Sequence, residues 1–174
     1  GPGVPVVVLQ ATPDGKWFFV REETAEGWVP SDKVALCSRG DFLKYVARLA
    51  QNPGVIVASA TTVYADESMT LPVTPASMGA VFALKGTGGR TIEVSFPRRD
   101  MEGHLRWTSA FIPREDISVG FLPFTARVLL VQAFKMLDRP YRWGNASDGQ
   151  DCSGFLQMVF ASVGVKLPRN SSEQ

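Results

Sequence analysis

The chain has 174 residues, of which 45% are hydrophobic and 20% are charged. This composition is typical of folded globular proteins and excludes a largely disordered chain. The 18 Lys and Arg residues nearly balance the 17 Asp and Glu residues, and a formal net charge of +1 argues against a large nucleic-acid-binding face. No apolar run reaches the length of a membrane-spanning helix, so we expect no transmembrane segment.

The first 37 residues contain short β-rich runs separated by turn signals. They predict strands over residues 4–9, 16–20 and 27–30, with the turn sequence ATPDG between the first two. This tight succession of strands, with the element Gly27-Trp28-Val29, resembles the last strands of a bacterial SH3-like barrel. We therefore expect residues 1–37 to form the C-terminal part of a first SH3-like domain.

A helical connector is predicted next, over residues 38–53. Apolar residues recur at helical spacing over residues 41–50, Asp41 is a suitable N-cap, and Asn52-Pro53-Gly54 ends the pattern.

Residues 54–120 return to short strands and turns, which predict a second SH3-like domain in the form of a small barrel. The expected strands cover residues 55–60, 61–64, 80–84, 91–96, 105–108 and 110–112. Pro72 and Pro75 are expected to lie in turns.

The last part of the chain, residues 121–174, predicts two helices. Thr125 can cap a helix that runs to about Asp138, where Arg139-Pro140 stops it. A second apolar periodicity begins at Cys152 and ends at Gly164, with Asp151 as its N-cap. The predicted fold class is therefore α+β.

Cys152 falls in the first turn of that second helix. Free backbone N–H groups and the helix dipole favour an anion there, and the thiolate is the nucleophilic form of cysteine. Its angular position, within about 40° of Leu156 and Val159, predicts that it faces the body of the protein. Periodicity alone leaves two interpretations open, an activated nucleophile and a buried structural cysteine.

The sequence around Cys152 resembles a known family. The pattern Tyr141-x-Trp143-Gly144, a polar loop, Asp151-Cys152-Ser153-Gly154-Phe155 and the later run GVKLPRNS is similar to the N-terminal half of an NlpC-type cysteine peptidase domain. Members of this family have a papain-like fold and hydrolyse peptides of the bacterial cell wall. The lead-in GFLPFT at residues 120–125 resembles members that carry two SH3-like domains, which are γ-D-glutamyl-L-diamino acid endopeptidases. Asn145 departs from the family pattern, which usually has a second glycine there.

The resemblance implies roles for six residues. Cys152 would be the nucleophile, and the ligand would be a peptidoglycan-derived peptide of the type L-Ala-γ-D-Glu-diamino acid. Tyr141 and Trp143 would border the cleft, Asp151 and Ser153 would hold the free amino end of the peptide, and Ser171 would line the same pocket. No cofactor and no metal are expected, because no Cys/His cluster has the spacing of metal ligands.

A cysteine nucleophile needs a histidine base, which in this family follows the cysteine on a later strand. The chain has one histidine, His104, which precedes Cys152 and is expected in a surface turn. We therefore expect a fragment whose base lies beyond this chain. The alternative from another functional class is a non-catalytic SH3-like module that binds cell-wall peptide. Family members act in the cell envelope, periplasmic or extracellular, or in the cytoplasm on recycled peptides. The oligomeric state is not predicted.

Overall fold

The computed structural model describes residues 2–137, 139–145 and 149–174. The chain begins with an antiparallel sheet in the order β1 (Val7–Ala11), β2 (Trp17–Arg21) and β3 (Glu26–Pro30). We call these three strands the first module. They confirm the predicted strands with small shifts of their bounds, and the 3-10 helix η1 (Ser31–Lys33) follows them.

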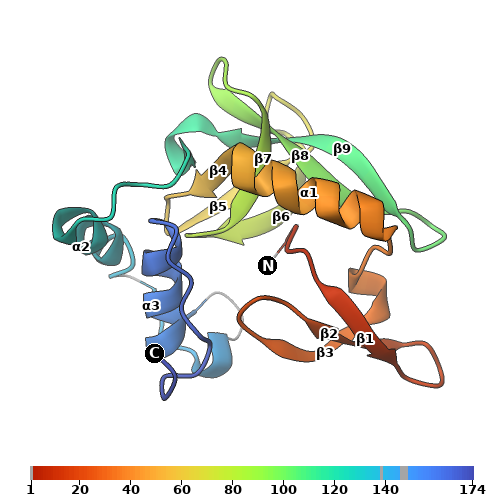
Figure 1. Ribbon diagram of the computed structural model, residues 1–174. Helices are drawn as coiled ribbons and strands as arrows, with labels where there is room; N and C mark the ends of the chain where they lie inside the picture. The colour runs from red at the N-terminus through yellow and green to blue at the C-terminus, as the bar shows by residue number, and fades with distance from the viewer. Residues whose placement is uncertain (1, 138, 146–148) are drawn as a thin grey trace.

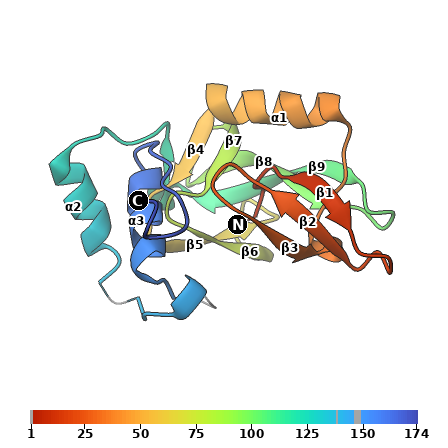
Figure 2. The same ribbon diagram turned by 60° about the horizontal axis from the view of Figure 1, so that its bottom comes forward.

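The connector helix α1 (Arg39–Gln51) crosses one side of the molecule (Figures 1 and 2). Its predicted cap was wrong, because Ser38 accepts the backbone N–H of Asp41 and Asp41 itself lies in the first turn. The buried ring of Tyr45 packs on Trp107, with 4.8 Å between ring centroids, and its hydroxyl donates to the Gly3 carbonyl over 2.8 Å. One aromatic side chain therefore joins α1 to both the N-terminal segment and the strand that contains Trp107.

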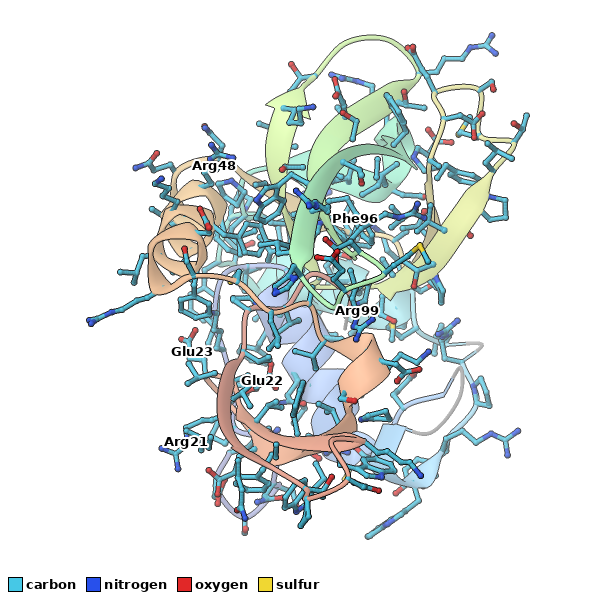
Figure 3. All side chains as sticks on the ribbon, turned by 90° about the vertical axis from the view of Figure 1, so that its right-hand side faces the viewer. Arg21, Glu22, Glu23, Arg48, Phe96 and Arg99 are labelled. Carbon is cyan, nitrogen blue, oxygen red and sulfur yellow. The ribbon has the colours of Figure 1, made fainter. Side chains whose placement is uncertain are left out.

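The second module is a seven-stranded antiparallel sheet with the order β10-β4-β7-β8-β9-β5-β6. Its interior is apolar; Phe82 and Val94 are fully buried, and Phe96 lies among them (Figure 3). The strands are β4 (Pro53–Ile56), β5 (Ala60–Tyr64), β6 (Pro72–Ser77), β7 (Val81–Gly86), β8 (Thr91–Arg99), β9 (Leu105–Pro113) and β10 (Ile117–Val119), with the 3-10 helix η2 (Arg114–Asp116) before β10.

Several bounds in this module differ from the sequence predictions. Pro72 and Pro75 lie in strand β6 and not in turns, because β6 is an edge strand and proline can occupy a position that donates no ladder hydrogen bond. The two strands predicted over residues 105–112 are one strand, β9. The short strand β10 was not predicted, and strand β4 begins at Pro53, two residues before the predicted strand.

Two helices follow the second module, α2 (Ala126–Phe134) and α3 (Cys152–Ala161), with the 3-10 helix η3 (Trp143–Asn145) between them. Thr125 caps α2 as predicted, but α2 ends before Asp138, which lies outside the described residues. Gly164 follows α3 with a φ of 83°, which confirms its predicted place past the helix end. These elements confirm the predicted α+β class.

The helix α3 packs directly on the second module. Buried Met78, at the turn between β6 and β7, forms an apolar cluster with Met136 and Val159. In the same turn Gly79 has a φ of 81°, and a Cβ atom there would lie 2.5 Å from the Cβ atom of Ala161. A residue without a side chain is therefore needed where the turn meets α3.

The two helices lie together at one end of the molecule, and the turn between β8 and β9 lies at the other end (Figures 1 and 2). The turn between β2 and β3, which Figure 3 marks by Glu22 and Glu23, reaches the segment after α3, where Lys166 forms an ion pair with Glu23. In the described part of the chain, no helix has both the length and the apolar character that a bilayer crossing requires.

Candidate active site around Cys152

Cys152 is the first residue of α3, and its side chain is an exposed free thiol. Its exposure excludes the buried structural cysteine that periodicity had left open. The prediction that it faces the body of the protein was wrong; Leu156, one turn later on the same face, is also 39% exposed. The residues that α3 buries at its start are Ser153 and Gly154. As a first-turn residue, Cys152 has a backbone N–H with no partner inside the helix.

Asp151 caps this helix, as predicted. Its Oδ1 atom accepts the Gly154 N–H over 2.8 Å, and its Oδ2 atom accepts the Gly144 N–H over 3.0 Å. Gly144 has a φ of 69°, a conformation that glycine adopts without strain. The carboxylate of Asp151 thus binds both the start of α3 and Gly144, which follows Trp143 in the loop before the helix.

Arg169 is a further partner of Asp151, and its role was not predicted from the sequence. The Nη2 atom of Arg169 lies 2.7 Å from Oδ2 of Asp151, and its Nη1 atom lies 3.3 Å from Oδ1 and 2.7 Å from the hydroxyl oxygen of Ser153. Hydrogen bonds from Arg169 and the capping bond from Gly154 lower the pKa of Asp151 to about 2, although burial of the carboxyl acts in the opposite direction. The opposite charges of Asp151 and Arg169 are evident from the sequence, but a contact between residues 18 positions apart could not be predicted from it.

The other predicted site residues lie around this centre. Tyr141 is 63% exposed and Trp143 is 85% exposed, and the backbone of Tyr141 pairs with Gln150. Asp151 and Ser153 are buried, at 7% and 5% exposure. Ser171 is exposed in a turn of the segment after α3. Of the polar loop predicted at residues 145–150, residues 146–148 lie outside the described residues.

The two remaining candidates for cysteine chemistry lie elsewhere. His104 is exposed and follows the turn between β8 and β9, at the opposite end of the molecule from α3. Cys37 is a free thiol next to α1; burial, together with the charge of Asp41, raises its pKa. The structure therefore brings neither of them to Cys152.

The contacts of Asp151 predict a pH-dependent contribution to stability. Replacing Asp151 by asparagine keeps a capping side chain and removes the ion pair, so it should lower the free energy of unfolding near pH 6 by about 1–3 kcal/mol. Because folding lowers the pKa of this carboxyl, its contribution is present above the unfolded pKa of 3.8 and is lost as the pH falls through about 2. Urea unfolding of both proteins between pH 6 and pH 2.5 should show the difference shrinking. A difference that stays constant over this range would contradict the assigned ion pair.

Parts of this chain are similar to known protein families and to a solved structure. Residues 138–174 match the model of the NlpC/P60 family, and residues 1–30 match that of an SH3 domain of the SH3b1 type. A solved NlpC/P60 endopeptidase from Photobacterium damselae subsp. piscicida superposes with a TM-score of 0.79 at 18% identity, over 99% of this chain and 36% of that chain. This likeness shows that the fold is shared.

Two relatives come from Bacillus subtilis (strain 168). The gamma-D-glutamyl-L-lysine dipeptidyl-peptidase is 30% identical over 109 residues, which are 56% of this chain and 37% of the relative. The bifunctional muramidase/DL-endopeptidase CwlT is 44% identical over 48 residues, which are 26% of this chain and 15% of the relative. The chain thus spans well under half the length of either relative. Residues 138–174, which carry Cys152, are thus similar to the NlpC/P60 family, and residues 1–30 are similar to an SH3 domain of the SH3b1 type.

Proposed function

We propose that Cys152 is the nucleophile of a cysteine endopeptidase that hydrolyses γ-D-glutamyl bonds to a diamino acid in peptidoglycan peptides. The observation that carries this proposal is the exposed free thiol at the first position of a capped helix. The names of the two Bacillus relatives, a gamma-D-glutamyl-L-lysine dipeptidyl-peptidase and a DL-endopeptidase, support the bond type.

The chemistry follows from the position of the thiol. The thiolate of Cys152 attacks the carbonyl carbon of the γ-D-glutamyl bond, the amine of the diamino acid leaves with a proton, and water then hydrolyses the acyl-enzyme. The backbone N–H of Cys152, free at the helix start, can stabilise the oxyanion. Since His104 lies at the other end of the molecule, we propose that the base is a histidine outside residues 1–174.

The surrounding residues divide into two groups by burial. Tyr141, Trp143 and Ser171 are exposed, so they are available to contact a peptide beside Cys152. Asp151 and Ser153 are buried beneath that surface, and an ammonium group that reached them would share the carboxylate with Arg169. A charge-assisted hydrogen bond to the free amine of L-Ala would favour peptides with an unblocked amino end.

The same proposal extends to the architecture and the place of action. We propose that the units are residues 1–37 and 54–120, both SH3-like, a connector at residues 38–53, and the peptidase segment at residues 121–174. We propose that the activity takes place in the bacterial cell envelope, where peptidoglycan is found, or in the cytoplasm if recycled peptides are cleaved.

The experiment that tests this function is hydrolysis of L-Ala-γ-D-Glu-diaminopimelate, with release of L-Ala-γ-D-Glu followed by mass spectrometry. We expect the longest natural polypeptide that contains these residues to cleave it, and the N-acetylated peptide to be cleaved at least about tenfold more slowly. Residues 1–174 alone should show no turnover. Turnover by residues 1–174 that His104→Ala abolishes would contradict the proposed base. Peptide binding without any cleavage by the longest form would instead support the non-catalytic module.

A further inference from the structure

The segment after α3 folds back onto the turn that carries Cys152. The side-chain amide of Gln157 donates to the carbonyl of Leu167 over 2.9 Å. The side-chain amide of Gln174 donates to the carbonyl of Pro168 over 2.7 Å and to that of Ser153 over 3.2 Å. Residues 167–174, which we call the return loop, are thus bound to the first two turns of α3.

Arg169 is the charged residue of this loop that reaches the helix start. Its two terminal nitrogens meet both carboxylate oxygens of Asp151, the fork geometry in which arginine holds a carboxylate most strongly. One of the two nitrogens also donates to the hydroxyl oxygen of Ser153. Arg169 therefore holds the side chains on both sides of Cys152 in the sequence.

The charge of Arg169 matters as much as its geometry. Asp151 is 7% exposed, so its negative charge is poorly screened by water. A like charge nearby disfavours a second anion, and the residue next to Asp151 is the one that must become a thiolate. The guanidinium of Arg169 cancels the carboxylate charge, which leaves the first turn of α3 with no net negative side-chain charge beside the sulfur.

We propose that Arg169 is a positioning residue that makes Cys152 reactive, by balancing the charge of Asp151 and by fixing Asp151 and Ser153 on either side of the thiol. This inference rests on the proposed role of Cys152 as a nucleophile. It assigns Arg169 no contact with the peptide, because its assigned hydrogen bonds point inward to Asp151 and Ser153.

The test is the rate of alkylation of Cys152 by iodoacetamide, which needs no peptidase activity. The thiolate sulfur attacks the CH₂ carbon and iodide leaves, so the rate reports the reactive thiolate. A Cys37→Ser background leaves one thiol, and mass spectrometry follows its modification between pH 5.5 and pH 9. Four variants are compared in this background: Arg169→Gln, Asp151→Asn, both together, and Lys166→Gln as the control.

The expected results have opposite signs for the two partners. Arg169→Gln removes the guanidinium charge beside the Asp151 carboxylate and should slow alkylation at neutral pH on the order of tenfold. Asp151→Asn leaves the guanidinium uncompensated and should accelerate it, and the double variant should return to within about threefold of the parent. Lys166→Gln removes one positive charge from the same part of the chain and leaves Asp151 paired, so it should react at the parental rate.

Circular dichroism and thermal unfolding establish that each variant is folded. Alkylation of folded Arg169→Gln at the parental rate would overturn the inference, and so would a double variant no faster than Arg169→Gln alone. If Arg169→Gln does not fold, the alkylation rate of Asp151→Asn tests the inference. Faster alkylation than in the parent supports charge balance, whereas slower alkylation would show that the pair has a purely structural role and would overturn the inference. Failure of the proposed function looks different, since it would appear as unimpaired hydrolysis by a protein that lacks the Cys152 thiol.

Discussion

Replacing Cys152 by alanine should lower kcat for γ-D-glutamyl peptide hydrolysis by at least about 10³-fold, because no acyl-enzyme can form without the sulfur. The folded protein should be unaffected. Cys152 is exposed, so its truncation leaves no cavity, and the free energy of unfolding should change by less than about 0.5 kcal/mol. Product release by the longest natural polypeptide that contains these residues, measured over a range of peptide concentrations, gives kcat and KM, and urea unfolding gives the stability.

Cys37→Ala is the matched control, since it removes the chain's other free cysteine sulfur. It should leave kcat within about twofold of the parent, because Cys37 lies between η1 and the start of α1, and the start of α1 is far from α3 (Figures 1 and 2). A Cys152→Ala protein that keeps more than a tenth of the parental kcat would exclude a covalent mechanism through this residue.

Replacing Gly79 by alanine should lower the free energy of unfolding by about 2–5 kcal/mol. An L-residue at a φ of 81° costs about 1–2 kcal/mol, and a Cβ atom 2.5 Å from that of Ala161 forces a rearrangement that costs about 1–3 kcal/mol more. The backbone carbonyl oxygen of Met158 lies 3.0 Å from the same Cβ position, so the added methyl group is crowded by the backbone of α3 as well. The midpoint of guanidinium unfolding measures the effect, and peptide hydrolysis should fall with it because α3 carries Cys152.

Two further variants separate the two costs. Gly120 has nearly the same φ, 82°, and no atom within 4 Å of its Cβ position, so Gly120→Ala reports the backbone cost alone. Adding Ala161→Gly to Gly79→Ala removes the colliding methyl group and should recover part of the lost stability. Equal destabilisation by Gly79→Ala and Gly120→Ala would show that contact with α3 is not what restricts Gly79.

The start of α3 could be predicted from the sequence because its signals are local. Asp151 as a cap, the apolar spacing after Cys152 and Gly164 past the end all act within a few residues. The same holds for Thr125 at the start of α2. The cap of α1 was misplaced by three positions because Ser38 and Asp41 are both good capping residues, and spacing alone does not choose between them.

The exposure of Cys152 could not be predicted in the same way. Periodicity finds which residues of a helix share a face, but it does not say which neighbouring element covers that face. In the structure, this face of α3 is covered by the second module at Val159, whereas Cys152 and Leu156, nearer the helix start, stay exposed. The helix and its apolar face were therefore predicted correctly, and the length over which that face is covered was not.

Contacts between residues far apart in the sequence could not be predicted either. Arg169 stands 18 positions after Asp151, and no local rule pairs them. Strand β6 was missed for a related reason, since its two prolines exclude a central strand and only the sheet order shows that β6 lies at an edge. Both the Asp151–Arg169 contact and the edge position of β6 depend on how the whole chain folds, which local sequence patterns do not show.

The packing of Met78 against Met136 and Val159 affects how this protein can be divided for engineering. A cut made after β10 would separate α2 and α3 from the methionine that completes their apolar cluster, and both surfaces would then meet water. Fusing residues 121–174 to an unrelated carrier would have the same effect, even though the family match begins only at residue 138. A transplant that preserves Cys152 should therefore include the turn between β6 and β7, which means taking the whole second module with the helices.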